Sequence, residues 1–234
     1  MKTVEEFQAG QTLLIDKPLK WSSFQAVNKI KLALKSRFKL RKLKVGHAGT
    51  LDPLATGLLI ICVGKNTKKI PEFQGQVKEY TGTFTVGGTT PSYDLESEIN
   101  EHFPTAHITD ELIHNATKSF LGEIDQVPPI FSALKVDGKR MYELARAGEA
   151  VEVSSRKITI NEFEITRIAL PEIDFRVVCS KGTYIRSLAH DFGKTLHSGA
   201  YLSALRRTKI GDFDVKNAIS PDEFGESLRV SNEN

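Results

Sequence analysis

The segment VGHAGTLDPLATGLLIICVG, residues 45–64, joins a turn-forming loop to an unbroken apolar run. Glycine and proline restrict the loop, because glycine admits positive φ and proline fixes its own φ while keeping the preceding residue extended. The run from Leu58 to Val63 is short and bracketed by glycines, which favours a buried strand. One carboxylate, Asp52, therefore stands at the mouth of a predicted strand. Two interpretations remain open for Asp52: a turn residue that bonds its own backbone, or a pinned reactive group.

The composition is that of an ordinary globular protein, with 234 residues of which 40% are hydrophobic and 26% charged. The apolar runs are too short to span a membrane, and acidic residues stand where a signal peptide would be apolar. We therefore expect a cytoplasmic protein without membrane association. Cys62 and Cys179 both lie in apolar runs, which is typical of buried thiols rather than of disulfides or metal ligands. No phosphate-cradling GxxxxGK[ST] segment occurs, so nucleotide triphosphate chemistry is not indicated.

Apolar periodicity predicts alternating strands and helices without a regular βαβ rhythm, which favours an α+β fold with a mixed, mostly antiparallel sheet. Neither a repeat nor a linker interrupts the chain, so we expect one domain over 1–234, with a core at 11–213 and a polar tail at 214–234. The absence of a coiled-coil pattern makes a monomer the expectation. Strands are expected at 11–15, 57–63, 78–86, 158–165 and 175–179, and helices at 109–122, 140–147, 183–196 and after Ser22 or Ser23, where Phe24, Val27, Ile30 and Leu34 form the apolar stripe.

Positive charge is concentrated on both sides of the Asp52 loop, although the net charge is only +3. Such a run is commonly a solvated helix face. Its position around a candidate catalytic loop instead favours contacts to a phosphate backbone. The basic residues are Lys29, Lys31, Lys35, Arg37, Lys39, Arg41, Lys42 and Lys44 before the loop, and Lys65, Lys68 and Lys69 after it.

A reactive aspartate needs a cation beside it to remain ionised in a dry pocket. The segment CSKGTYIRSLAHDFG, residues 179–193, offers Arg186 at a strand-to-helix turn, next to Tyr184. An ordinary surface cation on a helix is the alternative for Arg186. His47 precedes Asp52 by five residues and suits either a catalytic base or a bond to the loop backbone.

Four segments, in this order, resemble the bacterial tRNA pseudouridine-55 synthases of the TruB type. They are GHAGTLDPLATGLL, KEYTGTFTVGGTTPSYD, QVPPIFSALKVDGKRMYELARAGE, and CSKGTYIRSLAHDFG followed by LRRTKIG. The resemblance extends from about residue 13 to residue 213. Each segment alone is a weak or moderate signal, whereas four in order over most of the chain are specific.

The resemblance implies a catalytic domain with an RNA-binding cleft that isomerises uridine-55 in the T-loop of tRNA, without cofactor or metal. The target base would be turned out of its stack, because uracil cannot be reached inside it. Whether the nucleophile attacks the sugar C1′ or the uracil C6 stays open. By position, Asp52 matches the family's nucleophile and Arg186 matches the partner of that aspartate. Tyr80 matches the aromatic residue that stacks on the target base, Tyr184 and Leu205 match residues that line its pocket, and His47 matches the histidine that takes the place of the flipped base in the T-loop stack. Lys68 and Lys69 are expected to bind substrate.

Many relatives continue into a small RNA-binding PUA domain, and we expect this chain to lack it, with the basic segment 29–44 as additional anchoring. Two other classes of function remain. One is a T-loop binding protein or RNA chaperone that keeps the fold without the chemistry. The other is a different enzyme with an aspartate nucleophile, such as a hydrolase, which the missing metal and phosphate motifs disfavour.

Overall fold

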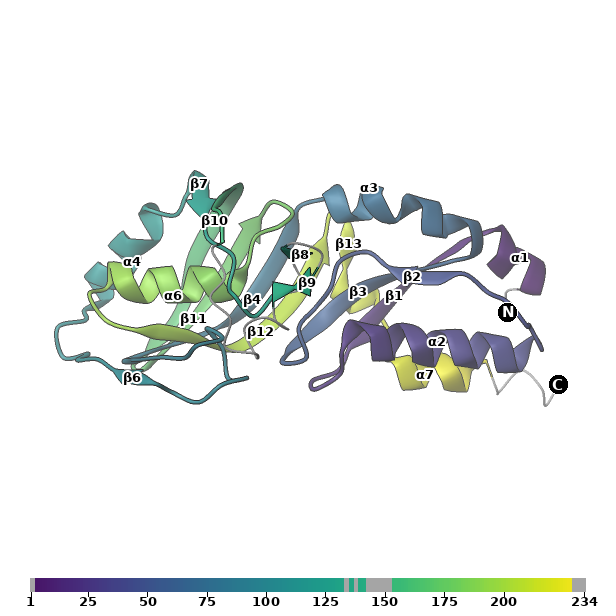
Figure 1. Ribbon diagram of the computed structural model, residues 1–234, viewed down its shortest axis with the longest axis horizontal. Coiled ribbons are helices and arrows are strands. Elements are labelled where there is room, and N and C mark those ends of the chain that lie inside the picture. The colour runs from purple at the N-terminus through teal and green to yellow at the C-terminus, as the bar shows by residue number, and fades with distance from the viewer. Residues whose placement is uncertain (1–2, 133–134, 137–138, 142–152, 229–234) are drawn as a thin grey trace. The chain divides into compact units, whose positions relative to one another are not determined.

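The computed structural model describes residues 3–132, 135–136, 139–141 and 153–228, and it confirms the α+β class (Figure 1). The chain divides into two compact units: the first unit is Met1–Tyr80 with Leu205–Asn234, and the second unit is Thr81–Ala204. Both boundaries fall within strands, β4 (Lys78–Val86) and β12 (Ala200–Ile210). Within the described ranges, none of the helices is long and apolar enough to cross a membrane.

The first unit is built on β3 (Ala55–Val63), which pairs antiparallel with β1 (Gln11–Lys17) over most of its length. On its other edge, β3 pairs antiparallel with β2 (Val45–His47) at one end and parallel with β12 at the other. The short strand β13 (Phe213–Asp214) pairs antiparallel with the end of β12. The remaining elements of the unit are α1 (Val4–Ala9), α2 (Ser23–Arg37), η1 (Gly64–Lys69), α3 (Ile70–Gly75), η2 (Val215–Asn217) and α7 (Pro221–Ser227).

Helices cover both faces of this small sheet, which explains why the apolar run of β3 does not alternate with polar residues. Leu59, Ile61 and Val63 pack with residues of α2 and α7, whereas Leu58, Ile60 and Cys62 pack on the opposite face with α3. Figure 1 shows α2 and α7 on one side of β1 and β3 and α3 on the other. Cys62 is fully buried, as the sequence predicts, and burial raises the pKa of its thiol to about 11.

Helix α2 begins where the sequence predicts, but its buried stripe differs. Ser22 caps the helix in a capping box with Gln25. The prediction that Phe24 faces the core is wrong, because its side chain is 72% exposed. Ser23 takes the buried position instead, since its hydroxyl has hydrogen-bond partners in a neighbouring loop.

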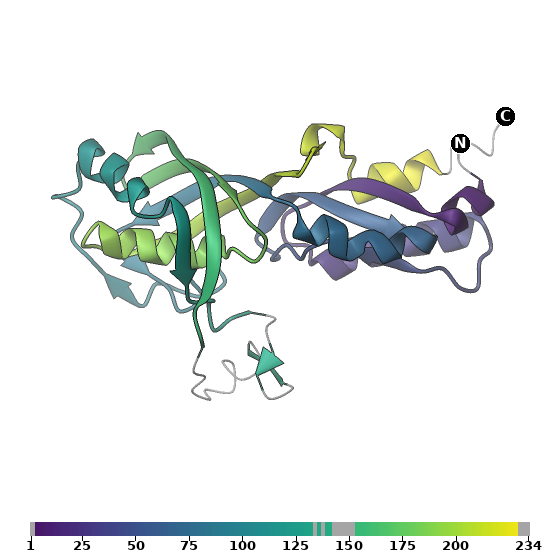
Figure 2. The same ribbon diagram turned by 90° about the horizontal axis from the view of Figure 1, so that it is seen from above.

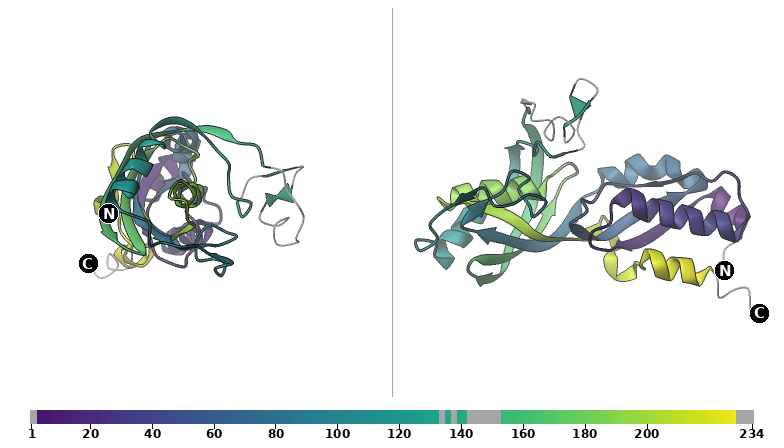
Figure 3. Two further views of the ribbon diagram at one scale, coloured as in Figure 1. Left: turned by 90° about the vertical axis from the view of Figure 1, so that its left-hand side faces the viewer. Right: turned by 60° about the horizontal axis from the view of Figure 1, so that its bottom comes forward.

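The second unit is a sheet with the strand order β12, β4, β11 (Glu172–Cys179), β10 (Arg156–Ala169) and β7 (Gly122–Gln126). Helices α4 (Asp110–Lys118) and α6 (Ile185–Thr195) pack on it, and in Figure 3 (left) α6 is seen end-on with the strands curving around it. The core is aromatic, and the rings of Phe84 and Phe175 stack with centroids 4.1 Å apart. Cys179 is buried in β11, as predicted.

Two hairpins complete the second unit: β5 (Gly88–Thr89) with β6 (Glu101–His102), and β8 (Lys135–Val136) with β9 (Lys139–Arg140). The β8–β9 hairpin stands away from the sheet of its unit (Figure 2). The helix expected over 140–147 is wrong at Arg140, which belongs to β9, and right at Met141, which is helical; residues 142–147 lie outside the described residues.

Candidate active site

The loop that carries Asp52 connects β2 to β3, and its backbone is held by the residues that lead into α2. The buried hydroxyl of Ser23 accepts a hydrogen bond from the backbone N of Leu51 at 2.8 Å and lies 3.1 Å from the carbonyl oxygen of the same residue, to which it donates. The backbone N of Lys20 donates to the carbonyl of Pro53 at 2.8 Å. The residues on both sides of Asp52 are therefore fixed, and the half-buried Asp52 side chain extends from a rigid support.

A buried arginine holds the other end of this loop. Arg207 is only 2% exposed, and its guanidinium donates to the carbonyl oxygens of Gly49 at 3.0 Å and Leu58 at 2.8 Å. Gly49 has a φ of 107°, which glycine adopts without strain. Gly46 does not use positive φ; a Cβ there would lie 2.9 Å from the terminal Cδ1 of Ile70, a flexible side chain that can shift, so a larger residue would need only a small rearrangement.

Lys17 is a second buried cation close to the Asp52 loop. Its ammonium donates to the carbonyl oxygens of Pro18 at 2.9 Å and Trp21 at 2.6 Å. Burial lowers the pKa of Lys17 to about 8, and the negative charges of Asp52 and Asp16 act in the opposite direction. Lys17 is therefore mainly protonated at pH 7, and its charge favours the ionised form of Asp52.

His47 lies at the end of β2, opposite Ile61 of β3, and is half-buried. Burial lowers the pKa of its imidazole, and the charge of Arg207 acts in the same direction, whereas the backbone of Gly49 opposes them. The ring is thus predominantly neutral at pH 7, with one nitrogen able to donate and the other able to accept a hydrogen bond.

Leu205 and Tyr80 also belong to the first unit. The backbone of Leu205 lies opposite Ala55, three residues after Asp52, and its carbonyl accepts a hydrogen bond from the hydroxyl of Thr56 at 3.4 Å. Tyr80 is half-buried in β4. The exposed Lys68 and Lys69 follow β3 in η1.

Arg186 lies in the second unit, in the first turn of α6, and is 4% exposed. One terminal nitrogen donates to the carbonyl oxygens of Phe131 at 3.0 Å and Ser92 at 3.3 Å. Its Nε lies 3.6 Å from a carboxylate oxygen of the buried Asp94. Arg186 is therefore a fixed buried cation rather than a surface one, which removes the alternative left by the sequence. Its pairing with Asp52 of the first unit stays a prediction.

Tyr184 immediately precedes α6, and its main chain is held by a side-chain amide. Gln126 accepts from the backbone N of Tyr184 at 2.8 Å and donates to its carbonyl oxygen at 3.0 Å. The guanidinium of Arg156 lies over the Tyr184 ring at 4.4 Å from the centroid, within the range of a cation–π contact. The ring position is thus set from β7 and β10.

Sequence reasoning missed buried charged residues, and three of them bear on the site: Lys17, Arg207 and Asp94. Two of them had a signal. Lys17 lies in the segment Asp16 to Pro18 at the end of a predicted strand, and Arg207 lies in LRRTKIG, a segment that the family resemblance already includes. Asp94 ends TTPSYD, where nothing in the local pattern distinguishes a turn aspartate from the partner of an arginine.

Comparison with known proteins identifies the family of the chain. The sequence model of the TruB family pseudouridylate synthase N-terminal domain matches residues 35–185, and that of the tRNA pseudouridylate synthase B C-terminal domain matches residues 186–234. The tRNA pseudouridine synthase B of Flavobacterium johnsoniae is 72% identical over 97% of this chain and 100% of its own length. The enzyme of the same name from Phocaeicola vulgatus is 55% identical, over 95% and 94% of the two chains.

Solved structures with the same fold come from larger assemblies. A chain of a Cbf5-Nop10-Gar1 complex superimposes with a TM-score of 0.75 at 28% identity, and this chain spans 99% of its own length but only 58% of that one. A chain of an H/ACA ribonucleoprotein bound to a substrate RNA containing 2′-deoxyuridine gives a TM-score of 0.71 at 26% identity, with 99% and 57% covered.

The fold, together with these similarities, defines an isomerase of the pseudouridine synthase class. Within that class, the chain belongs to the TruB family, whose curated members named above are tRNA pseudouridine synthases.

Proposed function

We propose that this chain converts uridine-55 in the T-loop of tRNA to pseudouridine, with Asp52 as the nucleophile. Membership of the TruB family supports the uridine isomerisation, and the high identity to curated tRNA pseudouridine synthases supports tRNA as the substrate. The position in tRNA, the identity of the nucleophile and the extrusion of the base are the parts proposed here.

The observation that carries the proposal is the rigid support of Asp52. The hydroxyl of Ser23, the guanidinium of Arg207 and the backbone of Lys20 hold the loop on both sides of the carboxylate. A nucleophile must be held in reacting geometry before the substrate arrives, because each loose degree of freedom lowers the rate. A turn aspartate with only a structural role needs no such external clamps.

The chemistry requires no net exchange with solvent other than protons. The carboxylate of Asp52 adds to the extruded uridine, the bond between N1 and C1′ breaks, and a bond between C5 and C1′ forms; the bond to Asp52 breaks again, which returns the free carboxylate. C5 then loses its proton, and N1 gains one. Extrusion of the base costs a few kcal/mol, which stacking and hydrogen bonds in the pocket offset.

The other residues have supporting roles in this proposal. Tyr80 stacks on the target uracil, Tyr184 and Leu205 line its pocket, and His47 takes the place of the extruded base in the T-loop stack. Lys17 and Arg186 supply positive charge that keeps Asp52 ionised at neutral pH. The phosphates of the T-arm lie against lysines, among them Lys68 and Lys69.

The test is release of tritium from C5-labelled uridine in an unmodified tRNA transcript. We expect release with the native protein and a loss on the order of 10⁴-fold or more with Asp52→Asn, because the amide cannot form the covalent intermediate. Asp212→Asn is the matched control, since Asp212 is an exposed carboxylate of the same unit, and it should release tritium at the native rate.

A transcript with cytidine in place of uridine-55 tests the position. Release that persists with this transcript would overturn the assignment to uridine-55. Tight tRNA binding without release by the native protein would overturn the enzymatic proposal and favour an RNA chaperone.

A further inference from the structure

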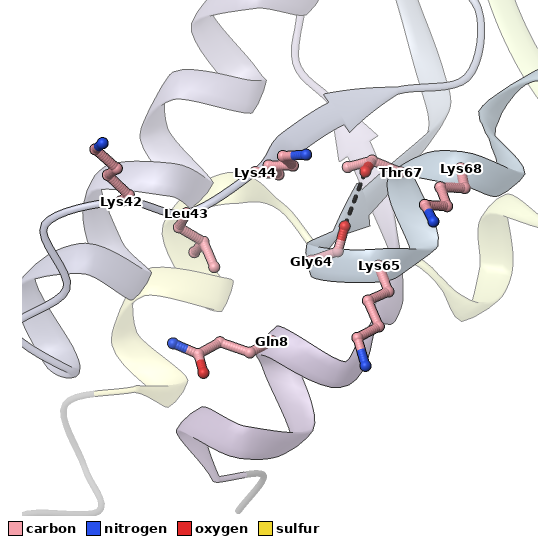
Figure 4. A pocket seen from close by; sticks show the side chains of 8 residues that line it. All are labelled: Gln8, Lys42, Leu43, Lys44, Gly64, Lys65, Thr67 and Lys68. Carbon is pink, nitrogen blue, oxygen red and sulfur yellow. Dashed lines mark hydrogen bonds between the residues drawn. The ribbon is translucent and has the colours of Figure 1, made fainter.

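A cavity of about 280 Å³ opens in the first unit and shares none of its lining with the Asp52 loop. Three segments distant in sequence form it: α1, the segment that leads into β2, and η1. We call this cavity the lysine pocket. It is lined by Gln8, Lys42, Leu43, Lys44, Gly64, Lys65, Thr67 and Lys68 (Figure 4).

The backbone that forms the lysine pocket is held together at Gly64. Gly64 has a φ of 62°, and a Cβ at this position would overlap the carbonyl oxygens of Phe7 and Gln8, so α1 can approach η1 only because this residue is glycine. The backbone N of Gly64 donates to the carbonyl of Lys44 at 2.9 Å, which ties the third wall to the other two. The Thr67 hydroxyl donates to the carbonyl of Gly64 at 2.8 Å. The pocket is therefore preformed.

The lining combines an apolar surface with a cationic rim. The buried side chain of Leu43 faces Gln8 across the opening, and Lys42 and Lys65 lie on opposite sides of it (Figure 4). All four lysines that line the pocket are exposed, so their methylene stems cover the walls while the ammonium groups remain in water. No carboxylate is among the lining residues. Four like charges around one opening attract an anion.

We propose that the lysine pocket binds a backbone phosphate of the RNA substrate together with its ribose, at a nucleotide other than the one that reacts. The ammonium groups would contact the phosphate oxygens, and Leu43 with the lysine stems would contact the sugar. A volume near the lower limit of ligand pockets, about 300 Å³, suits a sugar phosphate better than an inorganic ion. Lysines at the rim would bind the charge of a phosphate irrespective of the RNA sequence, which suits anchoring of a helical RNA stem. This inference rests on the proposed function.

The test compares two double variants that remove the same charge. The double variant Lys42→Ala with Lys65→Ala removes the ammonium groups from two sides of the lysine pocket. The double variant Lys209→Ala with Lys216→Ala removes two exposed lysines of the same unit that lie outside the pocket. The Kd of an unmodified tRNA transcript is measured from low to moderate salt. For the pocket variant we expect a roughly tenfold weaker Kd at low salt and a slope of log Kd against log salt that is smaller by about 1 to 2. The loss should appear in KM rather than in kcat, and the control variant should match the native protein.

A second measurement separates RNA phosphate from free phosphate. With the Leu43 methyl groups isotopically labelled, inorganic phosphate and a uridine dinucleotide are each titrated and followed by NMR. Shifts with the dinucleotide at lower concentration than with phosphate support the proposal. An unchanged tRNA salt slope in the pocket variant overturns it, and shifts with inorganic phosphate alone would then assign the pocket to a free anion.

These outcomes are independent of turnover. A native protein that releases no tritium, but whose tRNA affinity still depends on Lys42 and Lys65, would contradict the proposed function and leave the phosphate site standing. If the native protein releases tritium normally and the variant of Lys42 and Lys65 binds tRNA with unchanged affinity, the proposed function would stand and the phosphate site would be overturned.

Discussion

Among the residues whose burial the structure describes, each unit contains one arginine that is almost fully buried, and the two are held in different ways. Arg207 of the first unit directs its hydrogen bonds to the carbonyl oxygens of Gly49 and Leu58, at either end of the segment that includes Asp52. Arg186 of the second unit also donates to carbonyl oxygens, but its Nε faces the carboxylate of Asp94 at 3.6 Å. Arg207 thus stabilises the shape of a loop, whereas Arg186 is part of a charge arrangement. Substitution of Arg207 should therefore lower the stability of the fold, whereas substitution of Arg186 should lower the rate of the reaction.

The largest effect is expected for Arg207→Met. The variant leaves the carbonyl oxygens of Gly49 and Leu58 without their donor in a buried site, so we expect the free energy of unfolding to fall by about 4 kcal/mol. Chemical denaturation measures it. A native free energy of unfolding with abolished turnover would show that Arg207 acts on the substrate, and the comparison would fail.

Arg186→Lys should act on the rate instead. Lysine keeps the positive charge but cannot contact Asp94 and the carbonyl of Phe131 with one planar group, so we expect kcat for tritium release to fall about 100-fold. The matched control is Arg206→Lys, because Arg206 forms a more exposed ion pair with Asp16. Normal turnover by Arg186→Lys would contradict any catalytic role for this guanidinium.

Acid should destabilise the native protein through His190 of the second unit. Burial lowers the pKa of His190 to about 4, from 6.5. Between pH 6.5 and pH 4 the unfolded state therefore binds the proton that the folded state does not, and stability falls as the pH falls through this window, by about 2 kcal/mol after allowance for partial exposure. Burial raises the pKa of the neighbouring Asp191 carboxyl, which acts in the opposite direction.

The variant His190→Phe isolates this contribution, because it keeps a ring to stack on Tyr93, whose centroid lies 4.0 Å away, and removes the titration. Its free energy of unfolding should depend less on pH than that of the native protein between pH 4 and pH 6.5. Equal pH dependence of the two proteins would show that His190 does not carry the effect.

The smallest effect on stability is expected for Ser23→Ala, at about 1 kcal/mol, since the backbone of Leu51 loses a buried partner. Ser22→Ala is the control, because loss of the α2 cap costs a similar amount. Of the two serine variants, only Ser23→Ala should also lower kcat, since Ser23 contacts the Asp52 loop and Ser22 does not. Equal kcat values for the two variants would separate the rigidity of the loop from catalysis.

Local pattern predicted the strands and helices well where both periodicity and end signals are present. The strand in residues 57–63 was found because its apolar run is short and bracketed by glycines, and the helix with Ile185, Leu188 and Phe192 was found because burial repeats at the helical period. Phe24 was misplaced because a helical stripe can be drawn through it as easily as through Ser23. The pattern counts apolarity alone, whereas the fold buries a hydroxyl that has hydrogen-bond partners.

The sequence by itself determined the α+β class, the family and the identity of Asp52 as the residue to test, since these depend on periodicity and on ordered motifs along the chain. Only the tertiary structure decided which charged residues are buried and what they contact. Lys17 and Arg207 interact with the Asp52 loop although both are far from it in sequence. Asp94 and Arg186 form an ion pair although more than ninety residues separate them in the chain. The lysine pocket likewise exists only once α1 packs on Gly64. The physical reason is that burial and Coulomb interactions depend on distance in space, which no local pattern of residues encodes.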